Sequence, residues 1–325
     1  MKITALREFG VLLLLVLVCT VAAIREPRFL EPSSINSILL WAPLLIVVGI
    51  GQMMVIVTRG IDVSVGSMLG LSGMLVGILF RSQPGLNVGL GVLAGVGVGF
   101  LLGSLNGALI TWAKVPPIIA TLGTLSAFRG LIFIVSGGEQ IDGNDLPVAL
   151  NQWTLGGPLS VGGVTISWLL AMALALAGAA AWFLAKTRAG RDIYALGSNP
   201  EAARLRGVPV NRAQFLVYAI TGALAGLAGV MYASRFGFVN PATAGQGYEL
   251  TVIAAVAIGG TKITGGSGSI LGVVLGCFLL GAINVALAVL GIEASWQLLV
   301  YGVVILLALL IDAATRRTLE VRQVA

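Results

Sequence analysis

The chain has 325 residues, of which 58% are hydrophobic and only 10% are charged, and its mean hydropathy is +1.02. A water-soluble domain of this length needs more polar residues to cover its surface, so the composition excludes a soluble globular protein. The net charge of +6 does not indicate nucleic-acid binding, because the basic residues are distributed as a membrane topology requires.

Apolar runs of about 20 residues recur along the whole chain, and each can cross about 30 Å of hydrocarbon. The 45 glycines fit helices that pack closely in lipid, where small residues let backbones approach. We therefore predict an all-α polytopic membrane protein with about ten transmembrane helices, forming a single transmembrane domain over residues 1–325. The predicted spans are residues 10–24, 37–58, 63–80, 86–112, 116–135, 164–185, 213–233, 248–262, 268–290 and 295–312.

The basic residues give the orientation of these spans. With the N-terminus placed in the cytoplasm, most of the 19 Lys and Arg residues fall in inside segments. Only Arg25, Arg28, Arg81 and Arg235 fall outside. We therefore predict that both termini are cytoplasmic. The first span is short and follows two bases, so a cleaved signal peptide ending near residues 22–23 is the alternative.

Among the polar side chains inside or at the edge of the predicted spans, one acid with two neighbouring serines and two asparagines are candidates for a solute pathway or its gate. Asp62, with Ser64 and Ser67 after it, lies at the edge of the third span. An acid there can act in a gate, or it can cap the helix N-terminus. Asn106 and Asn284 lie within apolar helices, where they either line a pathway or hydrogen-bond to neighbouring helices.

Three other residues within spans have simpler interpretations. Arg129 is the one base well inside a predicted span, and its long side chain either snorkels to an interface or points into the bundle. Cys19 and Cys277 both sit in apolar spans, which indicates neither a disulfide framework nor a metal site. We interpret both cysteines as small packing residues.

The first long connection, residues 136–163, is rich in Gly, Asp, Asn and Pro and carries acids but no bases. It is too polar to span a membrane and too short to form a domain. On the predicted outer side, this segment is an ordinary connector, or it has a function, either as a surface for an external partner or as a lid over the pathway entrance.

The second long connection, residues 186–212, carries six bases and two acids on the predicted cytoplasmic side. Asn199 suits the N-cap of a short helix, Pro200 its first position, and Gly207 the position after its end. Glu201 falls in the first turn, where it complements the helix dipole. A helix of about two turns is marginal in water, so its caps indicate that the chain or a partner holds it. The alternative is a capped loop that only joins two spans.

A glycine-rich segment, residues 259–268, has its glycines spaced too densely for a regular helix. Non-helical backbone at membrane depth survives only where it is buried in protein or lines a cavity. The segment therefore either lines such a cavity or forms a hairpin in the cytoplasm.

Four segments carry motifs of a known family. They are G-I-D-V-S-V-G-S at residues 60–67, P-P-I-I-A-T-L-G-T-L at 116–125, T-R-A-G-R-D-I-Y-A-L-G-S-N-P-E-A-A-R-L-R-G-V at 187–208 and G-G-T-K-I-T-G-G-S-G-S-I-L-G at 259–272. In this order they extend over nearly the whole chain. The sequence resembles the sugar-type ABC importer permeases, which include ribose, rhamnose, xylose and autoinducer-2 permeases, and the segment 187–208 resembles their cytoplasmic coupling loop.

The resemblance implies a transport subunit of the bacterial inner membrane rather than an enzyme. It implies a second permease chain, identical or sister, a cytoplasmic ATPase that binds ATP and Mg, and a periplasmic sugar-binding protein. The solute would cross from periplasm to cytoplasm by alternating access. The chain itself would carry no cofactor, and it contains no G-x-x-x-x-G-K-[ST] motif. The helix coupled to the ATPase would comprise Asn199, Pro200, Glu201, Ala202, Ala203, Arg204 and Gly207.

An ion-coupled secondary transporter is the main alternative. It would need a coupling-ion site, commonly an acid or a histidine inside the membrane. The chain has no histidine and Asp62 is its only acid near the core, although sodium sites built from backbone carbonyls remain open. An enzyme would need a nucleophile, an acid–base pair or a metal cluster, and the sequence nominates none. No residue separates rhamnose, ribose and autoinducer 2 as solutes.

Overall fold

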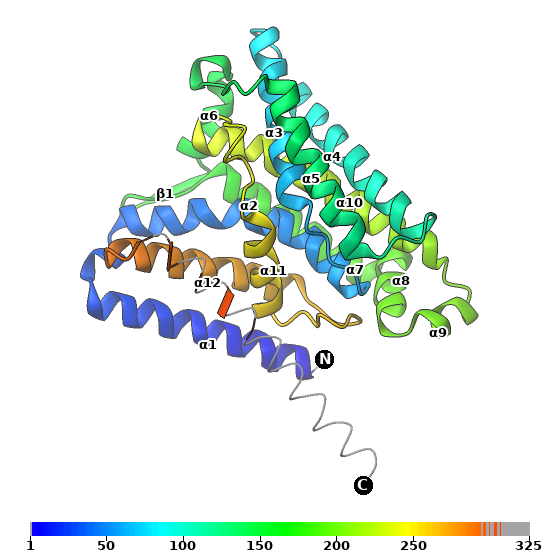
Figure 1. Cartoon of the computed structure of the whole chain (residues 1–325). Helices are drawn as coiled ribbons and strands as arrows, with labels where there is room; N and C mark the ends of the chain where they lie inside the picture. The colour runs from blue at the N-terminus through cyan, green and yellow to red at the C-terminus, as the bar shows by residue number, and fades with distance from the viewer. Residues whose placement is uncertain (1, 294, 297–298, 300–301, 304–305, 307–325) are drawn as a thin grey trace.

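The computed structural model describes residues 2–293, 295–296, 299, 302–303 and 306, and these form an almost wholly helical fold (Figure 1). Within this part of the chain, eight helices are long and apolar enough to cross a membrane. The prediction of an all-α polytopic membrane protein is therefore confirmed. The eight are α1 (Lys2–Arg25), α2 (Pro32–Val57), α3 (Val65–Ser82), α4 (Val88–Thr111), α5 (Pro117–Ser136), α7 (Trp168–Lys186), α10 (Val210–Phe236) and α12 (Ile270–Val289).

The eighth predicted span, residues 248–262, contains a shorter helix. Helix α11 (Tyr248–Ile258) has 11 residues, which cover about 16 Å, or roughly half of a hydrocarbon core. Gly247 precedes it in a left-handed conformation, and Gly260, also left-handed, follows its end. The tenth predicted span, residues 295–312, lies largely outside the described residues.

The connections carry the short elements. These are η1 (Pro27–Leu30), η2 (Gly143–Asp145), α6 (Val148–Leu155), β1 (Leu159–Val161), β2 (Val164–Ile166), α8 (Arg188–Ser198) and α9 (Pro200–Leu205). Strands β1 and β2 pair antiparallel, with Leu159 opposite Ile166. The polar connection over residues 136–163 is therefore folded, and its role as a partner surface or a lid stays a prediction.

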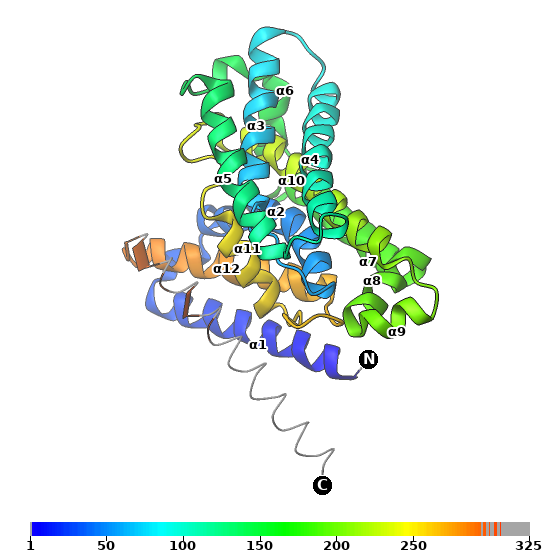
Figure 2. The same ribbon diagram turned by 45° about the vertical axis from the view of Figure 1, so that its right-hand side comes forward.

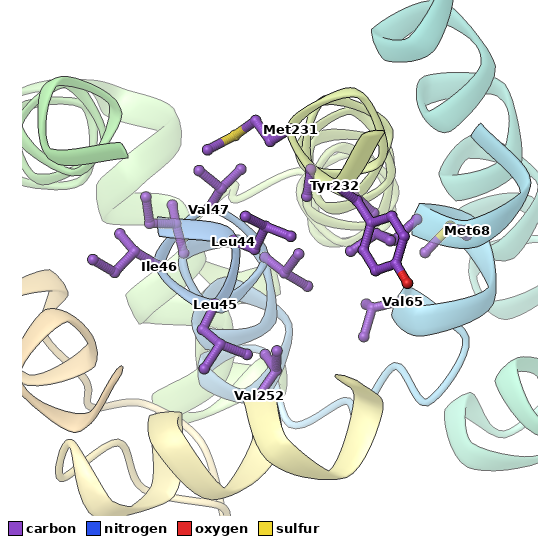
Figure 3. Close-up of a cluster of buried hydrophobic side chains, with 14 of the residues drawn as sticks. Leu44, Leu45, Ile46, Val47, Val65, Met68, Met231, Tyr232 and Val252 are labelled. Carbon is purple, nitrogen blue, oxygen red and sulfur yellow. The ribbon is translucent and has the colours of Figure 1, made fainter. Parts of the chain in front are cut away.

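Helix α2 lies at the centre of the fold (Figures 1 and 2). It packs against α7, α10, α11 and α12, and 89% of its most apolar 18-residue window is buried. Figure 3 shows Leu45 of α2 pointing toward Val252 of α11, while Met231 and Tyr232 of α10 lie on another side. A helix that is apolar around its whole circumference is buried in this way, because no face of it is suited to water.

Helices α4 and α10 pack backbone against backbone. Gly95, Gly99 and Gly103 recur every fourth residue on α4 and meet Gly222 and Gly226 of α10. A Cβ atom on Gly99 would lie 2.7 Å from the Gly226 Cα, well inside van der Waals contact. This close approach is the use of glycine that the composition indicates for helices in lipid.

Helix α1 lies along α12 at the edge of the fold (Figures 1 and 2). Only 11% of its most apolar window is buried, and side chains such as Leu13 and Leu17 are exposed. Large exposed apolar side chains are expected where a helix faces lipid. Both cysteines are free thiols, Cys277 fully buried in α12 and Cys19 half-buried in α1, and Cys277 packs as predicted.

Candidate functional site

Helix α2 ends in a turn that places an arginine in an unusual backbone conformation. Arg59 has a φ of 67°, and its N–H donates to the Ile56 carbonyl oxygen (2.9 Å). The Gly60 N–H donates to the Val55 carbonyl oxygen (3.0 Å). These two bonds form a Schellman motif, whose left-handed position is usually a glycine. The chain then runs without helical structure to Ser64, the N-cap residue of α3.

Asp62 and Ser64 lie in this connection and are fully buried together with Asn106 of α4. The Asp62 Oδ1 atom accepts hydrogen bonds from the Ser64 N–H (2.9 Å) and from the Ser64 Oγ (2.6 Å). The Asn106 Nδ2 donates to the Ser64 Oγ (2.8 Å) and, more weakly, to the Asp62 Oδ2 (3.5 Å). The carboxylate therefore bonds to the N-cap residue of α3 as in an Asx turn, whereas Ser64 makes no side-chain capping bond, so a capping role for Asp62 is not confirmed. A role in gating stays a prediction.

Polar side chains from three more helices enclose the connection. The Thr121 Oγ1 of α5 donates to the Ile61 carbonyl oxygen (3.3 Å), and the Tyr218 hydroxyl of α10 lies against Gly60. Gln52 of α2, with its amide oriented to satisfy both of its polar atoms, donates to the Asp62 carbonyl oxygen (3.1 Å). The non-helical backbone is thus buried within protein, where its polar groups find partners. Burial raises the pKa of the Asp62 carboxyl, and its hydrogen bonds with Ser64 and Asn106 oppose that rise.

The sequence analysis did not single out Gln52, Thr121 or Tyr218 as site residues. A glutamine in an otherwise apolar span was the available signal for Gln52. Thr121 and Tyr218 had no comparable signal, because threonine and tyrosine are common in membrane helices and their position beside the connection depends on packing.

The other candidates lie apart from Asp62 or support it indirectly. The Ser67 Oγ donates to the Ser64 carbonyl oxygen (2.8 Å) within the first turn of α3. Asn284 of α12 is half-buried and borders a separate cavity of about 410 Å³, whose lining includes none of the other candidates. The Arg129 Nη1 donates to the Ala244 carbonyl oxygen (2.6 Å), so this side chain points into the bundle.

The connection over residues 186–212 contains one helix that the sequence analysis missed and one that it predicted. The missed helix, α8, is N-capped by Thr187, whose Oγ1 accepts from the Gly190 N–H (3.0 Å). Its apolar residues Ile193 and Leu196 share a buried face. That amphipathic spacing, after a capping threonine, was the signal in the sequence.

The predicted helix, α9, has the caps expected of it. The Asn199 Oδ1 accepts from the N–H groups of residues 201 and 202 (3.0 Å each), and Pro200 is the first helical residue. Gly207 follows the end of α9 in a left-handed conformation (φ 78°). The Ala203 side chain is buried beneath α9, whereas Leu205 is 89% exposed, as are Glu201, Ala202 and Arg204 to lesser degrees. The helix therefore presents an apolar tip among charged side chains.

The end of α8 rests on α2 and on the glycine-rich segment. The Arg59 guanidinium donates to the carbonyl oxygens of Gly197 (Nε, 2.7 Å) and Ser198 (Nη2, 2.6 Å). The Gly266 N–H donates to the Val57 carbonyl oxygen (2.9 Å), and the Tyr194 hydroxyl donates to the Gly268 carbonyl oxygen (2.9 Å). Burial raises the pKa of the Tyr194 hydroxyl. We call this junction of α2, α8 and residues 259–268 the seat.

The glycine-rich segment is a hairpin between α11 and α12, and its location in the cytoplasm stays a prediction. Besides its contacts in the seat, it meets the N-terminal part of α1. The Arg7 Nη1 donates to the Gly260 carbonyl oxygen (3.2 Å), and the Ser269 Oγ donates to Glu8 (2.5 Å). The hairpin therefore joins α1, α2 and α8, which are far apart in the sequence.

Long apolar helices around an enclosed polar connection, with the capped helix α9 at one end, define a polytopic all-α membrane protein. The family described as "Branched-chain amino acid transport system / permease component" matches residues 34–309, and the chain belongs to that family. Its resemblance to the sugar-type ABC importer permeases is thereby confirmed.

The most informative relatives are three permeases with one name. The chain is 38% identical over 314 residues to "Autoinducer 2 import system permease protein LsrC" of Escherichia coli (strain K12 / DH10B), a match covering 97% of this chain and 89% of the relative. The protein of that name from Shigella flexneri has the same identity and coverage. That of Salmonella paratyphi B (strain ATCC BAA-1250 / SPB7) is 37% identical over 97% of this chain and 88% of its own length. No solved structure matches the chain significantly.

Proposed function

We propose that the chain is the membrane-spanning permease subunit of an ATP-driven importer of the bacterial inner membrane. It carries a sugar-like solute of the autoinducer-2 type from periplasm to cytoplasm by alternating access. The observation that supports this most directly is the 38% identity over 97% of the chain with permeases of autoinducer 2 import systems. The shared length includes both the enclosed connection and the coupling loop, because it leaves almost no part of the chain unmatched.

The helix α9 is the proposed contact with a cytoplasmic ATPase, which would bind ATP and Mg. Leu205 is the most exposed of the large apolar side chains in the described residues, and it lies in a region of bases and acids. An exposed leucine on a capped, seated helix is suited to an apolar pocket in a partner, with Arg204 at the polar rim. A second permease chain and a periplasmic sugar-binding protein complete the proposed assembly.

The proposed pathway needs only weak polarity, since a carrier that bound the sugar tightly inside the membrane would not release it. Asp62, Ser64, Ser67, Asn106 and Asn284 remain the candidates for a pathway or gate. The first four belong to one connected region around the α2–α3 connection, which makes that region the preferred site for gating. Asn284, beside a different cavity, is the independent candidate.

The experiment is a cross-link between α9 and the ATPase encoded with the permease. Leu205→Cys is made in a chain without Cys19 and Cys277, and it is paired with cysteines along the groove of the ATPase. Ala203→Cys is the matched control, because it lies on the same helix but is only 3% exposed. We expect cross-links at position 205 that change with ATP, and far fewer at position 203.

Uptake of autoinducer 2, ribose and rhamnose into proteoliposomes then tests the solute. ATP-dependent uptake of autoinducer 2 in preference to both sugars supports the proposal. Absence of a cross-link, together with uptake by the purified chain alone along an ion gradient, refutes it. The ion-coupled secondary transporter would then be the better description.

A further inference from the structure

Arg59 is one of two residues other than glycine that have a positive φ in the described part of the chain, the other being Lys114 after α4. The φ of 67° at Arg59 lies in the left-handed region, which residues with a Cβ atom adopt rarely. Glycine takes the equivalent position after α5, α9 and α10, at Gly137, Gly207 and Gly237. A strained conformation persists where the surrounding structure holds it in place, and at Arg59 the hydrogen bonds of the side chain do so.

The Arg59 side chain joins two segments of the seat. Its guanidinium donates to the carbonyl oxygens of Gly197 and Ser198 at 2.7 and 2.6 Å. These carbonyls belong to the last turn of α8, where no intrahelical donor is available and the helix dipole favours a cation. The fork of the guanidinium reaches both carbonyls at once, which a lysine ammonium does less well. Its aliphatic stem packs over Gly265, where a Cβ atom would overlap the Arg59 Cγ.

The two segments that Arg59 joins lead directly to α9 and to Asp62. Asn199, the N-cap of α9, is the residue after Ser198. On the other side, Asp62 follows Arg59 by three residues within the same enclosed connection. We call the two hydrogen bonds from Arg59 to Gly197 and Ser198 the clasp. The backbone around the clasp is tightly packed, because Gly197 lies directly against the Val57 carbonyl oxygen.

We infer that Arg59 is a positioning residue that ties the coupling loop to the α2–α3 connection, so that movement of α9 is passed to the region around Asp62. This inference rests on the proposed function, because it takes the cytoplasmic ATPase as the source of that movement. Without the clasp, α8 and α9 move while residues 60–66 stay where Thr121, Asn106 and Gln52 hold them.

The test compares hydrogen exchange of backbone amides in the assembled permease–ATPase complex with and without ATP. In the unmodified complex we expect ATP to change exchange by about fivefold or more, both in residues 199–207 and in residues 60–66. In Arg59→Gly we expect the change in 199–207 to persist and the change in 60–66 to fall below about twofold. Glycine relieves the left-handed strain, which offsets the loss of the two hydrogen bonds in part, so we expect this variant to keep a folded complex with thermal stability close to that of the unmodified one.

Two further variants complete the design. Arg191→Ala is the matched control, because its guanidinium donates only to the Lys186 carbonyl oxygen (3.2 Å) of its own loop, and it should retain both responses. Arg59→Lys keeps the charge without the fork and should give an intermediate response in 60–66.

The outcomes separate this inference from the proposed function. If the ATPase does not bind the unmodified chain, or ATP changes nothing in 199–207, the proposed function fails and the inference fails with it. If ATP changes 199–207 but not 60–66 in the unmodified complex, the inference alone is wrong. The inference is also wrong if Arg59→Gly keeps the ATP response in both 199–207 and 60–66. It is wrong as well if this variant loses both responses together with its thermal stability, because that result indicates a purely structural role for Arg59.

Discussion

The contact between α4 and α10 makes one position on α4 far less tolerant of a methyl group than its neighbour. At Gly99, an added Cβ atom would lie 2.7 Å from both the Cα and the N of Gly226, and closer still to the Gly222 carbonyl oxygen. At Gly97, two residues away on the same helix, an added Cβ atom would meet nothing within 4 Å. Gly99→Ala and Gly97→Ala are therefore a matched pair.

The loss of stability in Gly99→Ala depends on which atoms can move to relieve the overlap. Ordinary van der Waals contact begins at 3.4 Å, so the backbones at Gly99 and Gly226 must separate by at least 3.4 − 2.7 = 0.7 Å. Both sides of the contact are backbone, so no side-chain rotation relieves the overlap, and we expect a loss near the upper end of the usual overpacking range, about 3 kcal/mol. Gly97→Ala should instead stabilise by about 0.5–1 kcal/mol, because alanine favours the helix.

Thermal unfolding of the purified chain in one detergent measures this difference. At about 2–4 °C per kcal/mol, we expect the melting temperature of Gly99→Ala to be about 5 °C or more below that of Gly97→Ala. A second variant on the partner helix, Gly226→Ala, should behave like Gly99→Ala because it enters the same contact. Equal melting temperatures for Gly99→Ala and Gly97→Ala would refute the backbone contact on which this reasoning depends.

Three further outcomes follow from the site. Asn199→Ala should weaken α9 by about 1 kcal/mol and speed amide exchange in residues 200–206, whereas Asn199→Ser should keep the cap; equal exchange in both would contradict the capping role. Asn106→Ala should destabilise the chain by about 1–3 kcal/mol, measured by thermal unfolding. Asn106→Asp should destabilise it further, because it adds a carboxyl beside Asp62. An unchanged melting temperature in both variants would count against the buried network. In a background without other cysteines, a maleimide should label Leu205→Cys rapidly and Ala203→Cys slowly, and comparable rates would show that the orientation of α9 is wrong.

Features of the fold that depend on local sequence were predictable. Length and apolarity gave the long spans, because a helix in lipid must satisfy its backbone and face hydrocarbon over a fixed thickness. The caps of α9 were predictable for the same reason, since Asn199, Pro200 and Gly207 act within one or two turns of their own positions. The shortness of α11 was less accessible, because its apolar composition continues past Ile258 into glycines that end the helix.

Features that depend on contacts between distant residues were not predictable from one sequence. Asp62 could be recognised as a buried acid, but its partner Asn106 lies 44 residues away on another helix. Arg59 was counted only as a cytoplasmic base, because its charge fits the topology whether or not its side chain binds α8. Its left-handed conformation, which Lys114 after α4 shares, becomes visible only when the end of α2 is seen. What distinguishes Arg59 is its pair of hydrogen bonds to the last turn of α8.

The seat, formed by α2, α8 and residues 259–268, also has a consequence for how the protein is made. Its hydrogen bonds join Arg59 to Ser198, 139 residues away, and Tyr194 to Gly268, 74 residues away. A nascent chain emerges from its N-terminus, so α9 is synthesised well before the hairpin that completes its support. A chain that ends before the hairpin therefore has the Arg59 bonds to α8 but lacks the contacts that the hairpin makes with α8 and α2. If α9 binds a cytoplasmic ATPase as proposed above, recognition of a fully supported α9 would let that subunit assemble only with permeases whose synthesis has passed the hairpin, a quality check that arises from the order of the chain.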